Sequence, residues 1–334
     1  MVHGWARAHE DLAAMTLGVA VQEDKWPRIA VMGAGALGCY FGGMFARAGA
    51  PVTLIGRAHH VEAMARAGLF FDSIHFREQI PVSASTDAAA VRDAEIVLLC
   101  VKTPDTEEAA KSLAPHLRRG AVLVSLQNGV DNVERIRSAA GIDAIAACVY
   151  VAAEMTGPGR VKHTARGDLV IGDLSGLHGT DESRRPQLER VATLFGRAGI
   201  SCAVSENIAG ELWTKLIMNC AYNAISALSR CRYGRMVRSP WTRELMRQVI
   251  EEVIAVAYTA GVRLPDMNLV EAGLKLAETM PNAISSTAQD LARGKRTEID
   301  ALNGYVARRG AELGVATPVN QTLHALVKLL EEAA

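Results

Sequence analysis

Three polar side chains recur four residues apart inside the otherwise apolar stretch Glu211–Ser226. They are Lys215, Asn219 and Asn223. Positions four apart fall on one face of a helix of about 3.6 residues per turn, so an ammonium and two carboxamides share one stripe. An ammonium can stabilise a developing negative charge and give up a proton, and carboxamides can orient a substrate. The alternative is a lysine that extends from an amphipathic helix to solvent.

A buried ammonium is costly unless an acidic group lies near it. The best candidate in the sequence is Glu298, within residues 284–304, where it opens a helix and where Ser285 and Ser286 open the helix before it. Two capping-box spacings give these residues a structural alternative: Thr297 with Asp300, and Ser286 with Gln289. Capping and catalysis are compatible, because both place such residues at helix starts.

A second candidate site is the turn "GAGALG", which follows an apolar strand-like stretch and opens a helix. This context makes GxGxxG typical of a dinucleotide site, although a glycine turn without a ligand has the same letters. Gly33 permits the tight turn, Gly35 lets a pyrophosphate approach the backbone, and Gly38 lets the helix lie close to the sheet. Ala36 and Leu37 complete the predicted cofactor site, since a helix N-terminus offers free N–H groups to phosphate.

The end of the second predicted strand indicates which cofactor binds. Arg57 stands in "LIGRAHH", where an NAD site would place an acid. A guanidinium can bind the extra phosphate of NADP through two hydrogen bonds, so NADP is favoured over NAD. A solvated surface arginine is the alternative. Lys102 and Asn128 end two further strands and should face the cofactor, unless they are a solvated charge and an ordinary Asn-Gly turn.

The elements that must carry these residues divide the chain in two. Apolar strands alternate with helical segments up to about residue 205, which predicts a parallel sheet covered on both faces, followed by a hairpin in "GRVKHTARGDLVIGDL". Beyond it the pattern predicts helices over residues 207–228, 240–260, 266–279, 285–293, 297–313 and 319–333. We therefore expect an α/β fold: a Rossmann-type doubly wound sheet in residues 28–205, then an all-helical domain in 206–334. Residues 1–27 are expected to be an extension outside the fold.

Composition argues against several classes of protein. Of the 334 residues, 49% are hydrophobic and 22% are charged, with 36 basic and 36 acidic side chains. This balance predicts no nucleic-acid and no membrane partner, and no apolar run reaches the roughly 18 residues of a membrane span. The six cysteines have neither zinc nor disulfide-framework spacing. We expect no metal site, and reduced thiols in a cytoplasmic protein.

From Arg28 on, the sequence resembles the ketopantoate reductase family, the 2-dehydropantoate 2-reductases. The resemblance rests, in chain order, on "GAGALG", Arg57, "VKT", "QNG", "GPGRVKH", "ELWTKLIMNCAYN" and "SSTAQDLARGKRTEIDALNG". The last two motifs are specific, because few other dinucleotide enzymes combine them. The resemblance implies NADPH-dependent reduction of a small 2-keto acid, first of all 2-dehydropantoate to pantoate in pantothenate biosynthesis. It is also compatible with a homodimer.

The resemblance implies roles for individual residues. In the second half these are Lys215 as the catalytic lysine, Asn219 and Asn223 as substrate-binding asparagines, Ser286 as the serine that meets the substrate carboxylate, and Glu298 as the glutamate that contacts the site and the cofactor. In the first half, cofactor contacts fall on Lys102, Asn128 and the backbone near Ala153. We therefore expect a site between the domains, in a cleft that is open without ligand. Glu298 should contact Lys215 directly or through one water.

Three departures from the family's pattern lie near the expected cleft. Ala224 stands where a proline often follows the second asparagine, "YVAAE" replaces a Thr-His-Gly-Ala run, and Tyr233 falls near a substrate-contacting asparagine. They leave open another branched keto or hydroxy acid as substrate, or a sensor that binds NADP and has lost catalysis. The joint presence of Lys215, Asn219 and Glu298 speaks against the sensor.

Overall fold

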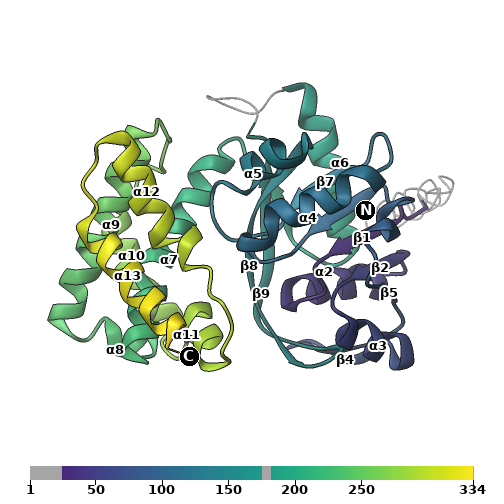
Figure 1. Cartoon of the computed structure of the whole chain (residues 1–334), viewed down its shortest axis with the longest axis horizontal. Helices are drawn as coiled ribbons and strands as arrows, with labels where there is room; N and C mark the ends of the chain where they lie inside the picture. Colours follow the sequence, from purple (N-terminus) through teal and green to yellow (C-terminus); the bar gives the residue numbers. More distant parts are fainter. Residues whose placement is uncertain (1–24, 175–181, 334) are drawn as a thin grey trace, which may run out of the picture.

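The computed structural model describes residues 25–174 and 182–333, which form two lobes lying side by side (Figure 1). Within this part of the chain, one lobe is built around a ten-stranded sheet and the other from helices. The long helix α7 (Ile208–Ser229) joins the lobes, because it packs against β8 and β9 of the sheet as well as against α9 and α11. Residues on α7 are thereby held at the boundary between the lobes.

The sheet is formed by short strands, most of them apolar. They are β1 (Ile29–Met32), β2 (Val52–Ile55), β3 (Leu69–Asp72), β4 (Arg77–Ile80), β5 (Ser83–Ser85), β6 (Ile96–Leu99), β7 (Val122–Ser125), β8 (Ala144–Gly157), β9 (Arg160–Gly172) and β10 (Cys202–Val204). Their order in the sheet is β4-β3-β9-β8-β7-β6-β1-β2-β5, with β10 beside β9. Strands β2, β1, β6, β7 and β8 are parallel, so their carboxyl ends meet at one edge, where such sheets bind ligands.

The expectation of a parallel sheet is only partly right, because two strand pairs are antiparallel. β8 pairs with β9, and β3 pairs with β4. The hairpin expected within residues 159–174 is wrong, because this segment is the single strand β9 and the turn lies before it, between Gly157 and Arg160. The long β8–β9 ladder shifts register between Tyr150 and Val151 and between Ala152 and Ala153. Opposite the first shift, Arg166 adopts a left-handed φ of 59°. Bulges bend a strand, and both strands curve along the side of the sheet that faces the helical lobe (Figure 1).

Helices cover both faces of the sheet, as the doubly wound fold requires. They are α2 (Ala36–Arg47), α3 (Ala58–Ala67), α4 (Thr106–Leu113), α5 (Asn132–Ala140) and α6 (Arg185–Arg197), with short 3-10 helices η1 (Ala88–Val91), η2 (Thr103–Asp105), η3 (Ala114–His116) and η4 (Glu182–Arg184). Successive strand residues face opposite cores: Val31 of β1 lies in one core with Phe41 of α2, and Ala30 lies in the other with residues of α4.

The second lobe is helical throughout its described length. Its elements are α7, α8 (Tyr233–Met236), α9 (Pro240–Thr259), α10 (Leu269–Thr279), α11 (Ser286–Ala292), η5 (Ile299–Ala301), α12 (Asn303–Leu313) and α13 (Pro318–Glu332). One prediction is wrong here: residues 297–313 are not a single helix. Leu302, with φ −108° and ψ −108°, separates η5 from α12. The short helix α8 was not predicted.

Trp26 corrects the expected limit of the N-terminal extension. Its ring packs edge-on against Phe45, with centroids 6.1 Å apart, and the Arg197 guanidinium lies 4.0 Å from its centroid. Trp26 therefore belongs to the folded lobe, whereas residues 1–24 of that extension lie outside the described residues. The last strand ends at Val204 and α7 begins at Ile208, on either side of the predicted boundary.

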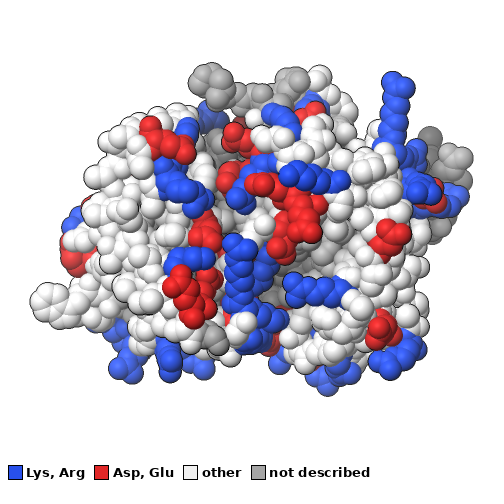
Figure 2. Space-filling model, in the orientation of Figure 1, with Lys and Arg blue, Asp and Glu red and all other residues white. Residues whose placement is uncertain are grey.

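Metal and membrane features can be assessed over the described ranges. Those residues hold no group of His, Cys, Asp and Glu suited to a metal ion, and none of their helices is long and apolar enough to cross a membrane. The six cysteines are free thiols. On the face drawn in Figure 2, basic and acidic side chains are mixed along the boundary between the lobes.

Candidate active site

The glycine turn has the shape that a dinucleotide pyrophosphate requires. Gly33 has φ 107°, and a Cβ there would lie 2.7 Å from backbone atoms of Cys100 and Val101. A Cβ on Gly38 would lie 2.0 Å from the Gly33 carbonyl oxygen, whereas one on Gly35 would meet no atom within 4 Å. Backbone atoms thus fill the space beside Gly33 and Gly38, whereas the space beside Gly35 is open. A ligand needs this open space to approach the Gly35 backbone closely.

The N-terminus of α2 also has the electrostatic properties that a pyrophosphate requires. Gly35 is the N-cap residue, no side chain caps the helix, and its first turn contains no acidic residue. The N–H groups of the first turn, which includes Ala36 and Leu37, are therefore available to an anion and carry the positive end of the helix dipole. These residues would hold the pyrophosphate of a dinucleotide.

Arg57 lies at the N-cap of α3, directly after β2, and is exposed. Within the described part of the chain its guanidinium has neither a hydrogen-bond nor an ion-pair partner. The pKa of nearby His60 is held below its usual value by burial and by the positive charges of His59, Lys295 and Arg57. Lys295 follows α11, so both lobes contribute to this positive region, which suits a phosphate.

Lys215 points into the boundary between the lobes and not toward bulk solvent. Its Nζ donates to Asn128 Oδ1 at 3.1 Å and to the Val149 carbonyl oxygen at 2.5 Å. It also lies 5.8 Å from the Tyr150 ring centroid. Burial lowers the pKa of Lys215, while Cys148 and Glu298 oppose this shift. The alternative of a solvent-directed lysine is therefore wrong.

Glu298 reaches from the helical lobe to the sheet lobe. Its Oε1 accepts from the Thr103 backbone N–H at 3.0 Å, and its Oε2 accepts from Asn128 Nδ2 at 2.9 Å. The Thr103 hydroxyl lies 3.1 Å from Oε1 and 2.7 Å from the Asn128 carbonyl oxygen. Asn128 thus joins the other two groups: its amide oxygen faces Lys215 and its amide nitrogen faces Glu298. No direct Lys215–Glu298 hydrogen bond forms among the described residues, and the Asn128 carboxamide connects the two side chains instead.

Neither predicted capping box is present. Glu298 is the N-cap residue of η5, but its side chain makes no capping bond, and Asp300 pairs with His324 instead. In α11 the cap is Ser285, whose Oγ accepts from the Ala288 N–H at 3.1 Å. Ser286 is one residue further on and exposed, so its hydroxyl is not used in capping.

The polar stripe continues from Lys215 along α7. Asn219, one turn further, has no hydrogen-bond partner for its side chain among the described residues. Asn223, one turn beyond, is 4% exposed, and its Nδ2 lies 3.5 Å from Ser286 Oγ. The stripe therefore runs from an ammonium, past two carboxamides, to a hydroxyl on α11.

Direct contacts join the two lobes beside the polar stripe, and the expected cleft that narrows on binding stays a prediction. Lys102 Nζ pairs with Asp290 Oδ2 at 2.9 Å and donates to the Arg296 carbonyl oxygen at 2.7 Å. Arg293 pairs with Glu154, the residue after Ala153 in β8. The predicted cofactor contact Lys102 is thus held by the helical lobe, next to the Thr103–Glu298 contact.

Several residues of this site were not predicted: Thr103, the Val149 carbonyl, Tyr150 and Asp290. Only Thr103 had a usable signal, since Thr-Pro after a strand is typical of a helix start, and a helix N-terminus attracts a carboxylate. Among the departures from the family's pattern, Tyr233 packs its ring 4.3 Å from that of Tyr222 in the helical core. It does not belong to the stripe.

The fold and site define the class of protein. A dinucleotide-binding turn, the carboxyl edge of a parallel sheet and a Lys–Asn–Glu set meet at one domain boundary, as in nicotinamide-dependent oxidoreductases. Family models described as "Ketopantoate reductase PanE/ApbA" and "Ketopantoate reductase PanE/ApbA C terminal" match residues 29–176 and 207–331. The chain belongs to the ketopantoate reductase family.

Individual relatives agree with this assignment. A 2-dehydropantoate 2-reductase of Pyrococcus horikoshii is 33% identical over 304 residues, which cover 91% of this chain and 97% of that protein. The crystal structure of a PanE/ApbA family ketopantoate reductase from Ralstonia eutropha is 50% identical, with a TM-score of 0.85, over 92% of this chain and 99% of that one. D-Mandelate dehydrogenase, in a ternary structure with NADH and anilino(oxo)acetate, is 24% identical with a TM-score of 0.84 over 92% and 99% of the two chains. At that identity the likeness shows the fold alone.

Proposed function

We propose that this protein reduces 2-dehydropantoate to pantoate with NADPH, and that Lys215 is the general acid. Family membership supports the reaction. The observation that carries the mechanism is the Lys215 ammonium, held beyond the carboxyl edge of the sheet by Asn128 and the Val149 carbonyl oxygen. Both contacts hold the ammonium at the boundary between the lobes, where we expect cofactor and substrate to meet.

Lys215 has the donor that the reaction needs. An ammonium carries three N–H groups, and two of them are engaged by Asn128 and Val149, which leaves the third for a keto oxygen. A bound NADPH would supply the hydride that adds to the keto carbon. The carbonyl oxygen then becomes negative, and Lys215 stabilises that charge before giving up its proton to form the hydroxyl. Its lowered pKa makes this proton easier to release.

Asn128 and Glu298 keep the ammonium charged and oriented. The Glu298 carboxylate fixes the Asn128 amide through Nδ2, so that Oδ1 must face Lys215. The negative charge of Glu298 also limits the fall of the Lys215 pKa caused by burial. A lysine that had fully lost its proton could not act as an acid.

The remaining stripe suits a small keto acid. The Asn219 carboxamide, one turn from Lys215, has no hydrogen-bond partner among the described residues, and the Ser286 hydroxyl, which does not cap α11, lies beside Asn223. These groups would bind the carboxylate and hydroxyl of the substrate, and would hold the keto carbon toward the nicotinamide. A small polar substrate needs several hydrogen bonds to be held in one orientation.

The preference for NADPH rests on Arg57. The fold alone does not select the cofactor, since the related D-mandelate dehydrogenase structure contains NADH. Arg57 lies exposed at the end of β2, without a carboxylate partner among the described residues, and can bind the extra phosphate. Lys295 enlarges the positive region.

A second candidate substrate is another branched 2-keto acid, and Tyr150 favours it. Its ring lies 4.3 Å from the Arg166 guanidinium and 5.8 Å from Lys215 Nζ, in the segment where the family often has a Thr-His-Gly-Ala run. The large Tyr150 ring, next to the Lys215 ammonium, would limit the size of the substrate's side chain or stack against it. The acceptor could therefore differ while the chemistry stays the same.

Steady-state oxidation of NADPH tests the proposal. We expect the highest kcat/KM with 2-dehydropantoate among a series of 2-keto acids of different branching. A higher value with another member of the series would favour the second candidate. No turnover with any of them, together with tight NADPH binding, would favour the inactive sensor. That the protein forms a homodimer is a separate prediction, which sedimentation velocity can test.

A further inference from the structure

The turn that carries Glu298 depends on contacts outside itself. Between α11 and α12 the only regular element in the described structure is η5, which spans Ile299–Ala301. The Glu298 side chain points away from its own lobe, to Thr103 and Asn128. Its backbone must therefore be fixed by the residues on either side of it.

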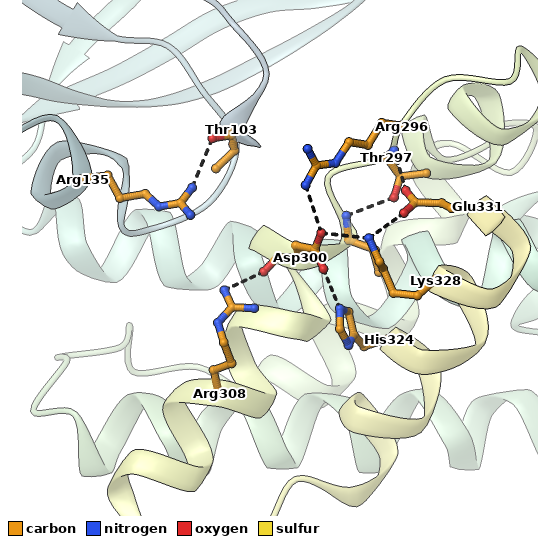
Figure 3. A network of polar contacts seen from close by, with 10 residues as sticks. Thr103, Arg135, Arg296, Thr297, Asp300, Arg308, His324, Lys328 and Glu331 are labelled. Atoms are coloured by element: carbon orange, nitrogen blue, oxygen red, sulfur yellow. Dashed lines mark hydrogen bonds and ion pairs between the residues drawn. The ribbon is translucent and has the colours of Figure 1, made fainter. Parts of the chain in front are cut away.

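One face of α13 supplies those contacts. His324, Lys328 and Glu331 are spaced four and three residues apart and so lie on the same face of the helix. Glu331 Oε1 accepts from the Thr297 backbone N–H at 2.6 Å, and Glu331 Oε2 pairs with Lys328 at 2.8 Å. Thr297, the residue before Glu298, is thus attached to α13 through its backbone (Figure 3).

Asp300 attaches the other side of the turn. Its Oδ1 lies 2.7 Å from His324 Nε2, and its Oδ2 lies 3.1 Å from Lys328 Nζ. Its backbone carbonyl accepts from Arg308 of α12 at 2.9 Å. In Figure 3, Asp300 lies at the centre of this network, while Thr103 and Arg135 lie across the boundary on the sheet lobe.

The helix that holds the turn is itself well anchored. Leu323 and Val327 of α13 are buried in the helical core, on another face from the polar residues. Gly304 makes room for the His324 contact, because a Cβ there would lie 2.7 Å from the imidazole Nε2. The attachment therefore connects a helix packed in the core to the turn that presents Glu298.

We propose that Asp300 is a positioning residue: held by His324 and Lys328, it sets the turn at residues 297–301 so that Glu298 reaches Asn128. The inference rests on the proposed function, which gives the Glu298–Asn128–Lys215 set its role in proton transfer. Asp300 touches neither Asn128 nor Lys215, so any effect on catalysis must pass through Glu298. Without Asp300, Glu298 would lose its fixed direction, and the Asn128 amide would no longer be oriented toward Lys215.

A double-mutant cycle tests this path. Asp300→Asn should lower kcat between about tenfold and 100-fold, the scale of a misplaced catalytic group, and should change KM for the keto acid much less. In a Glu298→Gln background, Asp300→Asn should have little further effect on kcat, because the group that it positions is already impaired. The control is Glu312→Gln, which removes a carboxylate that pairs with Arg309 on the surface of α12. Its kcat should equal that of the native protein.

Equal losses of kcat in the two backgrounds would overturn the proposal, and so would an unchanged kcat in Asp300→Asn. If Asp300→Asn does not fold, Lys328→Met carries the same cycle, since Lys328 contacts both Asp300 and Glu331. A crystal structure of the folded variant separates this inference from the proposed function. Loss of the Glu298–Asn128 hydrogen bond supports positioning even if the protein reduces no keto acid, and an intact bond contradicts it.

Discussion

Two turns build the site, and they obtain their shapes in opposite ways. The turn at residues 33–38 is shaped by missing side chains: a left-handed φ at Gly33 and a close backbone contact at Gly38. The turn at residues 297–301 is shaped by added contacts, from Glu331 to Thr297 and from His324 to Asp300. The residue types that the first turn requires therefore lie within one short stretch of sequence. The second turn depends on α13: Thr297 and Glu331 are 34 residues apart, and Asp300 and His324 are 24 residues apart.

This difference predicts different responses to mutation. Changes in the glycine turn should act through steric conflict and should affect folding and cofactor binding together. Changes in the turn at residues 297–301 should act through orientation and charge. They should have little effect on the free energy of unfolding, because the paired side chains there are partly exposed.

The largest effect on stability is expected for Gly38→Ala. The new Cβ would lie 2.0 Å from the Gly33 carbonyl oxygen, so helix and turn would have to separate. We expect a loss of about 3 kcal/mol in the free energy of unfolding, at the upper end of overpacking effects, measured by chemical denaturation. Cofactor affinity should fall as well.

Gly35→Ala is the matched comparison within the same turn. Its Cβ would meet no protein atom within 4 Å, and its φ of −84° suits alanine. Stability should stay within about 0.5 kcal/mol of the native value, while NADPH binding weakens. Equal destabilisation by both variants would contradict the assignment of the open space beside Gly35 to the ligand.

Arg57→Ala should affect the cofactor without disturbing the fold. Loss of one charge-assisted contact to the extra phosphate costs about 1.5–3 kcal/mol, or roughly 10- to 100-fold in NADPH affinity. NADH binding should change little, so the ratio of the two dissociation constants is the quantity to measure. An unchanged ratio would remove Arg57 from the cofactor site.

The pH dependence of turnover should show the smallest effect. Lys215 acts as an acid only when protonated, so kcat should fall as pH rises through its pKa, which burial places below the usual value for lysine. Glu298→Gln removes a negative charge that raises this pKa, and the alkaline fall should therefore begin at lower pH. Stopped-flow measurement of the hydride step would show it. A fall at higher pH in the variant would contradict the electrostatic role of Glu298.

The parts of the site that could be predicted are those encoded by short-range patterns. The glycine turn, the spacing of Lys215, Asn219 and Asn223, and the arginine after β2 are visible within a few residues of sequence. The Thr103–Glu298 contact joins positions 195 residues apart, and no local pattern reports it. Likewise the Val149 contact uses a backbone carbonyl, which every residue possesses.

The ends of helices also depend partly on the local sequence and partly on contacts between distant residues. Two serines in succession both fit a cap, and tertiary packing selected Ser285, whose hydroxyl also donates to the Asn223 carbonyl at 3.1 Å. The break at Leu302 was missed because residues 297–313 have a helical pattern throughout. The contacts of Thr297 and Asp300 with α13 accompany that break, and they involve residues after the predicted helix.

The most direct test of the central claim is the turnover of Lys215→Ala with NADPH and the preferred keto acid. We expect kcat to fall by about 10²- to 10⁴-fold, because the ammonium acts on charge that develops during the reaction, while the dissociation constant of NADPH stays near that of the native protein. Lys275→Ala, which removes an exposed lysine paired with Glu271 on α10, is the control and should retain full activity. Near-normal turnover in Lys215→Ala would show that the polar stripe is structural and that the proposed mechanism is wrong.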